Sequence, residues 1–596
     1  MKRSVLFAVC SAAVLAVAGA AIADPTIGSG AQSESSVAPR VLSGEDVRHY
    51  RALFADERAG DFAAARQDAE EISDPCLVGY AEAEHFFHAK RTALKTLAAW
   101  LEKYDELPVA SRVRELAEKR NKRHRVELAV APPPHPRGGW GFDSTEAMTE
   151  QPLETDAARG AEAQIVAAAR ADLPSQAEAV LQSLAAGNTA TTADVARLAH
   201  RVAQSYLAEG QDSDAWRVAT TALGGDRSAA PMLDWDAGLA AYRIGNYGDS
   251  ASHFETLAQS YAATAWGRSA GAFWAARAHI AAGDPLRVVT LLGAAAREQP
   301  TFYGMLAQRL LGEKFDTQFN DPVLDRTGFA AIVQNSAAHR AVALWQVGET
   351  DFVQPEMLRA LAALGPDQTV AFAALARSMD LPDLELRASE TQASRGVMLT
   401  GLFPMPHYTP PGGYQVDPCL VLAFARVESA FQSRAVSGAG ARGVMQIMPG
   451  TAQIVDGSRP AQLNDPAYSL GVGQKILQQL LSDVNGNLFQ LAAAYNAGPA
   501  SLTHWIGARP AIMNDPLLFI ESIPVGQTRS YIRRVMMFYW LYAQRAGRDS
   551  PSLDETATGG WPIYREPADS LPAKPQAKIP SATPGTTLIS DASIPH

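Results

Sequence analysis

Helix-length segments joined by tight turns recur through most of this 596-residue chain. Residues 235–261, "WDAGLAAYRIGNYGDSASHFETLAQSY", place apolar side chains at three- and four-residue intervals on both sides of a Gly-Asn turn. Residues 270–298 repeat this plan, with Gly283-Asp284-Pro285 as the turn. Because a helical hairpin cannot bury its apolar face alone, successive hairpins must stack on one another. The pattern predicts an all-α protein, built largely as an α-helical superhelical solenoid.

Clusters of proline and glycine divide this helical pattern into segments. Proline cannot continue a helix, and segments of low apolar content cannot join a core. From residue 414 the helical pattern is interrupted by glycine loops and by Tyr-Asn and Ile-Pro motifs, which indicates a second kind of helical domain. The expected segments are a signal peptide at 1–23, a disordered segment at 24–42, the solenoid at 43–394 with a Pro/Gly-rich insert at 130–156, a connector at 395–413, the second helical domain at 414–547 and a disordered tail at 548–596.

The N-terminus has the features of a secretory signal. Lys2 and Arg3 precede an apolar stretch, and Ala21-Ile22-Ala23 fits cleavage between small residues before Asp24. An uncleaved membrane anchor is the alternative, because the apolar run is close to the roughly 18 residues that can span a bilayer. No later stretch is long and apolar enough to do so, so we expect no integral membrane segment after signal cleavage.

Charge and cysteine usage exclude some classes of function. The formal net charge is −11 and no basic stripe is present, which argues against a nucleic acid as the partner. Cys76 and Cys419 each follow Asp-Pro at the start of an expected helix, and we expect both to be buried core residues rather than a disulfide. The 12 histidines are scattered and none has a metal-ligand spacing with Cys or Glu, so no metal and no cofactor are expected.

Glu428 is the one carboxylate in residues 426–453, "RVESAFQSRAVSGAGARGVMQIMPGTAQ". It follows Val421, Phe424 and Ala425 on one face of a helix that starts at Asp417-Pro418. Burial disfavours a carboxylate, so Glu428 is a candidate general acid with a raised pKa. The alternative is a half-exposed glutamate paired with Arg426 or Arg434.

Two later features favour a site at Glu428. A glycine loop runs from Ser437 to Gly443 and can approach a ligand closely, and Met445-Gln446 follows with an amide that can bind sugar groups. Further on, Tyr495 ends an apolar helix beside a glycine turn. Tyr495 is then a candidate contact of Glu428, and the alternative is a core tyrosine.

Together these motifs make residues 415–545 resemble the catalytic domain of soluble lytic transglycosylases, which are periplasmic murein-cleaving enzymes with a lysozyme-like fold. Three motifs occur in the family's order: Glu-Ser with its glycine loop and Gly-Val-Met-Gln at 428–446, Ala-Tyr-Asn-Ala-Gly-Pro at 494–499, and Glu-Ser-Ile-Pro with Thr-Arg-Ser-Tyr at 521–531. Upstream, "AFWAARAHIAAGDP" and "TFYGMLAQRLLG" resemble, more weakly, the family's helical superhelix.

The resemblance implies a role for each candidate residue. Glu428 is the single catalytic acid and the Tyr495 hydroxyl lies near it. The residues expected to bind substrate are Ser437, Met445, Gln446, Asn496 and Glu521. The sequence departs from the family where Gln527, Ser469 and Ile476 replace the usual Glu, Asn and Tyr. The expected partners are peptidoglycan glycan strands and other cell-wall enzymes, and the expected location is the periplasm.

The implied reaction needs no second carboxylate. Glu428 protonates the oxygen between N-acetylmuramic acid and N-acetylglucosamine, then deprotonates the sugar's 6-hydroxyl, which closes a 1,6-anhydro end. Substrate-assisted cleavage of this kind is an exception to the usual two-carboxylate glycosidase. Two alternatives remain open: a muramidase that uses Glu521 or Asp456 as its second acid, and a murein-binding scaffold without catalysis.

Overall fold

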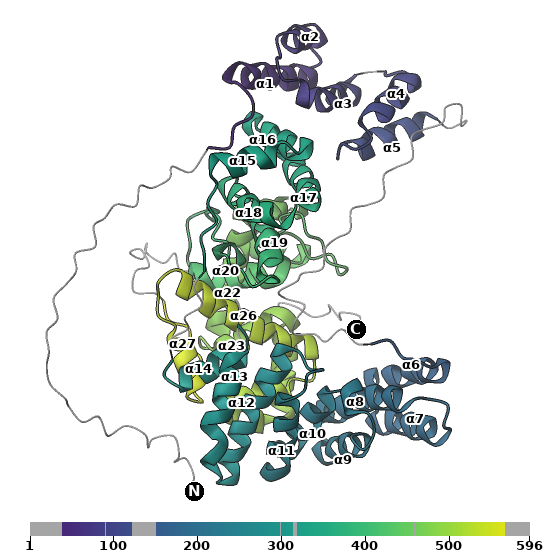
Figure 1. Ribbon diagram of the computed structural model, residues 1–596, viewed down its shortest axis with the longest axis vertical. Helices are drawn as coiled ribbons and strands as arrows, with labels where there is room; N and C mark the ends of the chain where they lie inside the picture. The colour runs from purple at the N-terminus through teal and green to yellow at the C-terminus, as the bar shows by residue number, and fades with distance from the viewer. Residues whose placement is uncertain are drawn as a thin grey trace, which may run out of the picture.

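The computed structural model describes residues 38–121 and 151–566, apart from 90, 299, 314–318 and 458. Throughout these residues the chain forms α-helices and short 3-10 helices, and β-pairing is limited to isolated bridges (Figure 1). This confirms the predicted all-α class. The signal peptide expected at 1–23 and most of the insert expected at 130–156 lie outside the described residues.

The helices fall into four groups along the chain. The N-terminal block contains α1 (Gly44–Ala59), α2 (Phe62–Glu70), η1 (Pro75–Leu77), α3 (Val78–His88), α4 (Leu94–Tyr104) and α5 (Ala110–Arg120). The second block contains α6 (Asp156–Arg170), α7 (Pro174–Ala186), α8 (Thr192–Glu209), α9 (Asp212–Ala222), η2 (Arg227–Ala229), α10 (Met232–Arg243), α11 (Tyr247–Ala258), α12 (Ala265–Ala282), η3 (Pro285–Arg287), α13 (Val288–Arg297) and α14 (Phe302–Leu310).

The last two groups follow without a long break. The third block contains α15 (Arg326–Val333), α16 (Ser336–Val347), η4 (Thr350–Phe352), α17 (Val353–Ala363), η5 (Pro366–Gln368), α18 (Thr369–Ser378), α19 (Pro382–Ala393) and η6 (Thr400–Leu402). The C-terminal domain contains α20 (Pro418–Ser429), α21 (Pro449–Asp456), η7 (Pro460–Asn464), α22 (Pro466–Asp483), α23 (Leu488–Ala497), α24 (Pro499–Ala508), η8 (Pro510–Asn514), α25 (Pro516–Ser522), α26 (Gly526–Arg545) and α27 (Pro551–Ala557).

Two apolar cores hold these groups together. One joins the N-terminal block, at the top of Figure 1, to the third block directly below it. The other is continuous from the second block into the C-terminal domain. The helices expected as one solenoid over 43–394 are therefore divided between two cores, and the second block packs directly against the C-terminal domain.

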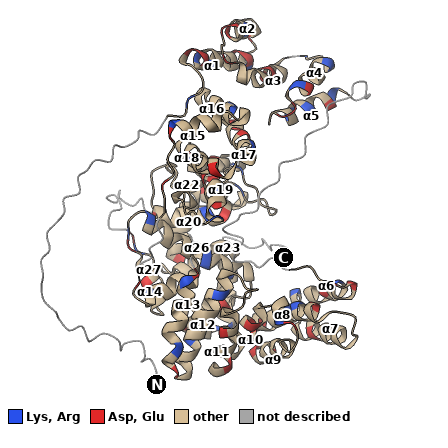
Figure 2. Cartoon of the chain, in the orientation of Figure 1, with Lys and Arg blue, Asp and Glu red and all other residues tan. Residues whose placement is uncertain are grey.

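Histidine–carboxylate pairs connect neighbouring helices within the blocks. The closest approaches are 2.5 to 2.9 Å, and each pair joins two different helices: His49–Asp68, His85–Glu57, His200–Asp236, His253–Asp234 and His279–Glu255. Acidic and basic side chains are interspersed along the helices of all four groups (Figure 2). The pairs explain why histidines that look scattered in the sequence are grouped with acids in space.

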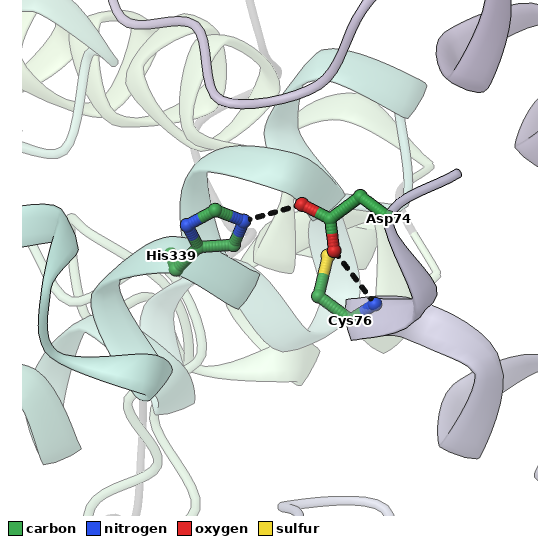
Figure 3. A group of neighbouring side chains, drawn as sticks. All are labelled: Asp74, Cys76 and His339. Atoms are coloured by element: carbon green, nitrogen blue, oxygen red, sulfur yellow. Dashed lines mark hydrogen bonds and ion pairs between the residues drawn. The ribbon is translucent and has the colours of Figure 1, made fainter. Parts of the chain in front are cut away.

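A further histidine connects the N-terminal block to α16. The Oδ2 atom of Asp74 accepts a hydrogen bond from Nε2 of His339 at 2.8 Å, and Oδ1 accepts one from the backbone N–H of Cys76 at 3.0 Å (Figure 3). The thiol of Cys76 lies with these two side chains, so an N, an O and an S donor lie within 4.8 Å of one another. Burial raises the pKa of the Cys76 thiol, which keeps it protonated. We interpret the group as a connection between blocks, which sequence spacing could not reveal.

The chain termini of the described region are more ordered than the sequence predicted. Residues 38–42 were expected to be disordered, but Leu42 is buried and the N–H groups of Val41 and Leu42 donate to the side chain of Gln346. The tail prediction at 548–596 is wrong for residues 548–566. There α27 packs against α14, and the Trp540 indole donates to Ser552 Oγ at 3.0 Å. A short segment with few apolar residues can dock when its aromatic side chains meet an existing core.

Candidate functional site

The helix α20 carries Glu428, and its start is fixed by several side chains. Asp417 caps α20 by accepting from the N–H of Cys419, and Pro418 occupies the first helical position. The buried carboxylate of Asp417 also accepts from the Tyr539 hydroxyl at 3.0 Å and forms an ion pair with Arg548 at 2.5 Å. The predicted helix start is confirmed, and its partners come from α26 and the residues that follow it.

The end of α20 lies immediately after Glu428. Ala430 and Phe431 have φ values of 47° and 67°, a region that residues other than glycine rarely adopt. Ser429 fixes this sharp turn by donating from Oγ to the carbonyl of Val444 at 2.8 Å. Strained backbone of this kind is found where a site needs a side chain in one place. Here the turn comes directly after Glu428, and Ser429 ties the end of α20 to the segment that follows the glycine loop.

Glu428 is paired with a tyrosine rather than with a cation. The Tyr531 hydroxyl of α26 donates to Oε1 of Glu428 at 2.5 Å. Burial raises the pKa of Glu428 to about 7, and the Tyr531 hydrogen bond and the charge of Arg534 offset part of this effect. The alternative partners are engaged elsewhere: Arg426 pairs with Glu390 at 3.1 Å and Arg434 with Asp351 at 2.5 Å.

Tyr495 lies beside this pair but does not bond to Glu428. Its hydroxyl donates to the carbonyl of Met445 at 2.9 Å. The Phe424 ring packs against Tyr495 with ring centroids 4.9 Å apart, and against Tyr531 at 6.1 Å. Tyr495 thus lies near Glu428, but the hydroxyl that bonds to the acid is that of Tyr531, and the catalytic role of Tyr495 stays a prediction. Tyr495 instead fixes the backbone of the glycine loop next to the acid.

The glycine loop is shaped by its own hydrogen bonds. Ser437 is exposed, and its Oγ accepts from the N–H of Ala441 at 3.0 Å. Gly443 has φ of 75°, and a Cβ atom there would lie 2.0 Å from the carbonyl oxygen of Leu463, so only glycine fits. The Gln446 amide donates to the carbonyls of Gly443 and Ala435 at 2.9 and 3.2 Å. The Nε2 atom of Gln446 thus stabilises the loop, and its Oε1 atom can still accept a hydrogen bond from a ligand.

Met445 and Asn496, both predicted to bind substrate, differ in their burial and in their contacts. The side chain of Met445 is fully buried and packs against Gly473, which is the position of a core residue, and its predicted contact with substrate stays a prediction. Sequence alone could not separate a core methionine from a groove methionine. Asn496 is half-buried at the end of α23, and its Oδ1 accepts from Thr528 Oγ1 at 2.8 Å.

The two acids considered as partners of Glu428 are occupied by cations. Glu521 is buried, accepts from the Tyr303 hydroxyl at 2.5 Å and pairs with Arg533 at 2.8 Å. Asp456 accepts from the Tyr468 hydroxyl at 2.6 Å and pairs with Lys475. The assignment of Glu521 to substrate binding is not supported by these contacts, since Glu521 joins α25 and α26 to α14 of the second block. No carboxylate of the described residues affects the pKa of Glu428.

The three departures from the family pattern lie near the loop or on the surface. Ser469 is fully buried, and its Oγ accepts from the Met445 N–H at 3.4 Å beneath Gly443. Ile476 is half-buried in α22 and Gln527 is exposed in the first turn of α26. Ser469 is therefore the one of the three that supports the loop directly.

Residues 411–515 match the family model described as the transglycosylase SLT domain. Over this segment the chain is similar to transglycosylases of the SLT type. Soluble lytic murein transglycosylase from Escherichia coli K12 is 29% identical over 269 residues, which cover 43% of this chain and 41% of that protein. A putative soluble lytic murein transglycosylase from Haemophilus influenzae is 31% identical over 145 residues, 23% of this chain and 24% of the relative. The alignments span less than half the length of these relatives.

Solved structures share the fold over most of the chain. The 70 kDa soluble lytic transglycosylase of Escherichia coli superposes with a TM-score of 0.53 at 18% identity, covering 87% of this chain and 99% of that one. An inactive mutant of lytic transglycosylase Slt from Pseudomonas aeruginosa gives a TM-score of 0.54 at 22% identity, covering 85% and 87%. The expected combination of helical superhelix and lysozyme-like domain is thereby confirmed as a fold.

Proposed function

We propose that this protein is a murein lytic transglycosylase that cleaves the bond between N-acetylmuramic acid and N-acetylglucosamine. The observation that carries the proposal is Glu428, a half-buried acid whose pKa is raised to about 7 and whose partner is the Tyr531 hydroxyl. An acid with a pKa near neutrality can both give and take a proton at working pH. The match of residues 411–515 to the transglycosylase SLT domain, and the similarity to soluble lytic murein transglycosylases, support this choice of substrate.

The proposed reaction uses Glu428 twice. In the first step its proton passes to the glycosidic oxygen, the C1–O bond of the muramic acid breaks, and N-acetylglucosamine leaves with a free hydroxyl. The substrate's own N-acetyl group stabilises the positive charge at C1. In the second step the Glu428 carboxylate takes the proton of the 6-hydroxyl while O6 bonds to C1. Tyr531 stabilises the carboxylate between the two steps by donating its hydrogen bond.

Hydrolysis by a muramidase is the main alternative, and the site favours it less. A two-carboxylate mechanism needs a second acid or base close to the first. Glu521 and Asp456 are the acids considered for that role, and each is paired with a cation outside the Glu428–Tyr531 pair.

We also propose that the protein acts in the periplasm on glycan strands and meets other cell-wall enzymes there. None of the described helices is long and apolar enough to cross a membrane.

Replacing Glu428 with glutamine tests the proposal. Glu428→Gln keeps the size of the side chain but removes the transferable proton, so we expect a folded protein with at least about 100-fold lower activity on purified murein. Mass spectrometry of the soluble products from the wild type should show ends lighter by one water than hydrolysis products. Activity of Glu428→Gln within a few fold of the wild type would refute the role of Glu428, and products without that mass difference would favour the muramidase.

A further inference from the structure

Three side chains that can bind a metal ion meet where the N-terminal block contacts the third block. They are Asp74 at the start of η1, Cys76 within η1 and His339 in α16 (Figure 3). A carboxylate oxygen, a thiol sulfur and an imidazole nitrogen from these residues lie within 4.8 Å of one another. Asp74 and His339 are 265 residues apart in the chain, so no spacing in the sequence indicates this group.

The separations between these atoms suit a small tetrahedral ion. Zinc lies about 2.0 to 2.3 Å from its nitrogen, oxygen and sulfur ligands, so two ligands of one ion are roughly 3.3 to 3.7 Å apart. Nε2 of His339 and Oδ2 of Asp74 are 2.8 Å apart, because they share a hydrogen bond. Placing an ion between them requires a separation of about 0.5 Å more, which rotation of the two side chains can supply.

The backbone that carries two of the three ligands is fixed from α1. The hydroxyl of the buried Tyr50 donates to the carbonyl of Asp74 at 2.7 Å and accepts from the N–H of Leu77 at 3.1 Å. Oδ1 of Asp74 accepts from the N–H of Cys76 at 3.0 Å, and Figure 3 shows the carboxylate beside the sulfur. Ligands that are already held in place lose less conformational entropy when an ion binds.

The donor set selects zinc among the common divalent cations. A thiolate and an imidazole are typical zinc ligands, whereas Mg²⁺ and Ca²⁺ take oxygen ligands. The carboxylate of Asp74 and the thiolate of Cys76 balance the two charges of the ion, so binding leaves no unpaired charge in this half-buried place. The charge of Arg340 acts on the Cys76 thiol, but Glu356 pairs with Arg340 at 2.6 Å.

An ion can reach the group from solvent. The side chains of His339 and Asp74 are 29% and 31% exposed, and Cys76 is half-buried. A zinc ion with three protein ligands completes its tetrahedron with a water molecule, which this exposure allows. Burial keeps the thiol protonated without a metal, and a bound cation displaces that proton through its own charge.

We propose that Asp74, Cys76 and His339 form a Zn²⁺ site that joins the N-terminal block to α16. On binding, the S–H bond of Cys76 breaks, an S–Zn bond forms and the proton passes to solvent. The neutral imidazole of His339 binds through Nε2 and carries its one hydrogen on Nδ1. Two ligands belong to the N-terminal block and one to the third block, so the ion cross-links the two parts of one core. The site is independent of Glu428 and of the proposed reaction.

Equilibrium dialysis of the full chain, prepared without a histidine tag, tests the site with Zn²⁺ as the probe. We expect one zinc ion per chain at micromolar zinc, and no saturable binding of Mg²⁺ or Ca²⁺ at the same concentration. Co²⁺ then serves as a spectroscopic probe of the same ligands. Tetrahedral Co²⁺ absorbs visible light, and a bond to thiolate adds a charge-transfer band in the near ultraviolet.

Ligand variants locate the ion. Cys76→Ser and His339→Gln should each weaken zinc binding at least about 100-fold, since loss of an outer partner of a ligand already costs about 10- to 100-fold. Cys76→Ser should also remove the charge-transfer band of Co²⁺. Cys419→Ser is the matched control, because Cys419 is the other cysteine of the described residues and lies in the C-terminal domain. Its zinc binding and its cobalt spectrum should equal those of the wild type.

A milder variant covers the case in which the ligand variants do not fold. Asp74→Asn keeps the size of the side chain and an oxygen to cap η1, but removes the charge, and should weaken zinc binding at least about tenfold. Zinc should also raise the melting temperature of the wild type and of Cys419→Ser, because an ion that binds only the folded chain stabilises it. It should not raise that of Cys76→Ser or Asp74→Asn to the same extent.

Three outcomes would overturn the proposal: no stoichiometric zinc binding at micromolar zinc, a cobalt spectrum without the thiolate band, or zinc binding that Cys76→Ser and Asp74→Asn retain in full. The last outcome would place the ion on other surface side chains. None of these outcomes depends on whether the wild type releases anhydro ends from murein.

Discussion

Tyr531 sets the proton affinity of Glu428 through one short hydrogen bond. Its hydroxyl donates to the carboxylate, so it stabilises the ionised form and lowers the pKa that burial raises. Tyr531→Phe removes that donor, and the pKa of Glu428 should move further above about 7. Because the first step needs the protonated acid, the limb of the pH–rate profile that falls at high pH should shift to higher pH. The rate should fall as well, since the second step loses its stabiliser. A pH–rate profile on murein measures both effects.

Tyr495→Phe is the matched control for this prediction. It also loses one hydroxyl beside Phe424, but that hydroxyl serves the carbonyl of Met445 and not the acid. The control should lose no more than about 1.5 kcal/mol of stability, the order of one neutral hydrogen bond, and should leave the alkaline limb in place. A shift of the limb in Tyr495→Phe, with none in Tyr531→Phe, would show that the roles of the two tyrosines are reversed.

The sequence identified the acid but not its partner. Glu428 stands on an apolar helical face, and this local pattern was enough to predict burial and a raised pKa. Tyr531 lies 103 residues further along the chain. Tyr531 ends the Thr-Arg-Ser-Tyr motif, but helical spacing does not predict whether Tyr495 or Tyr531 bonds to the carboxylate of Glu428. That choice depends on how α23 and α26 pack against α20.

The glycine loop depends on one glycine more than on the others. Gly443→Ala would force a Cβ atom against the carbonyl of Leu463 at a φ of 75°, so the loop next to Glu428 must shift. We expect a loss of more than about 1 kcal/mol in stability and a large loss of activity. Gly438→Ala is the control, because no atom lies within 4 Å of the Cβ position and its φ is not positive. Thermal melts and murein turnover of both variants measure the difference, and equal behaviour would contradict this account of the loop.

Residues 548–566 form part of the C-terminal domain. Trp561 packs against Phe519 with ring centroids 5.4 Å apart, and the Tyr564 hydroxyl accepts from the N–H of Asp417 at the start of α20. Truncation after Gly547 removes these contacts and should lower the melting temperature by several degrees, since loss of one packed tryptophan alone costs roughly 3 kcal/mol. Truncation after Glu566 is the control and should melt like the full chain. If both truncations melt alike, the segment contributes nothing to the fold.

Individual helices were easier to predict than their docking. Apolar spacing identified the hairpins, and Asp-Pro identified the starts of η1 and α20 correctly. The docking of 548–566 was missed because its composition is rich in proline, serine and threonine, and composition averages hide single aromatic residues. Trp561 and Tyr564 are single aromatic residues, but both pack against the core formed by the second block and the C-terminal domain.

At the scale of the whole molecule, sequence order does not give spatial order. The repeat pattern predicts that each hairpin stacks on the next, and this holds within the second block, where α10, α11 and α12 pack in succession. It fails between α5 and α6, because the N-terminal block shares its core with the third block instead. The contacts responsible, such as Tyr80 with Glu356, join residues 276 apart in the chain, and no local pattern records them.

The shared core of the N-terminal and third blocks predicts that cutting the chain between α5 and α6 will not separate its parts. The Tyr80 hydroxyl donates to Glu356 at 2.7 Å within the core, and Asp74 and Arg51 make further bonds to α16. Apolar burial is not weakened by salt, so the association should persist at high ionic strength. The experiment inserts a protease site after Pro136, cleaves the protein and passes it over a size-exclusion column. The two fragments should co-elute with and without salt.

Glu356→Gln removes the buried carboxylate that pairs with Arg340 at 2.6 Å and leaves only Glu106 at 3.9 Å, so the cleaved variant should release the N-terminal fragment more readily. Separate elution of the cleaved wild type at low salt would show that the covalent connection, and not the shared core, holds the N-terminal block in place.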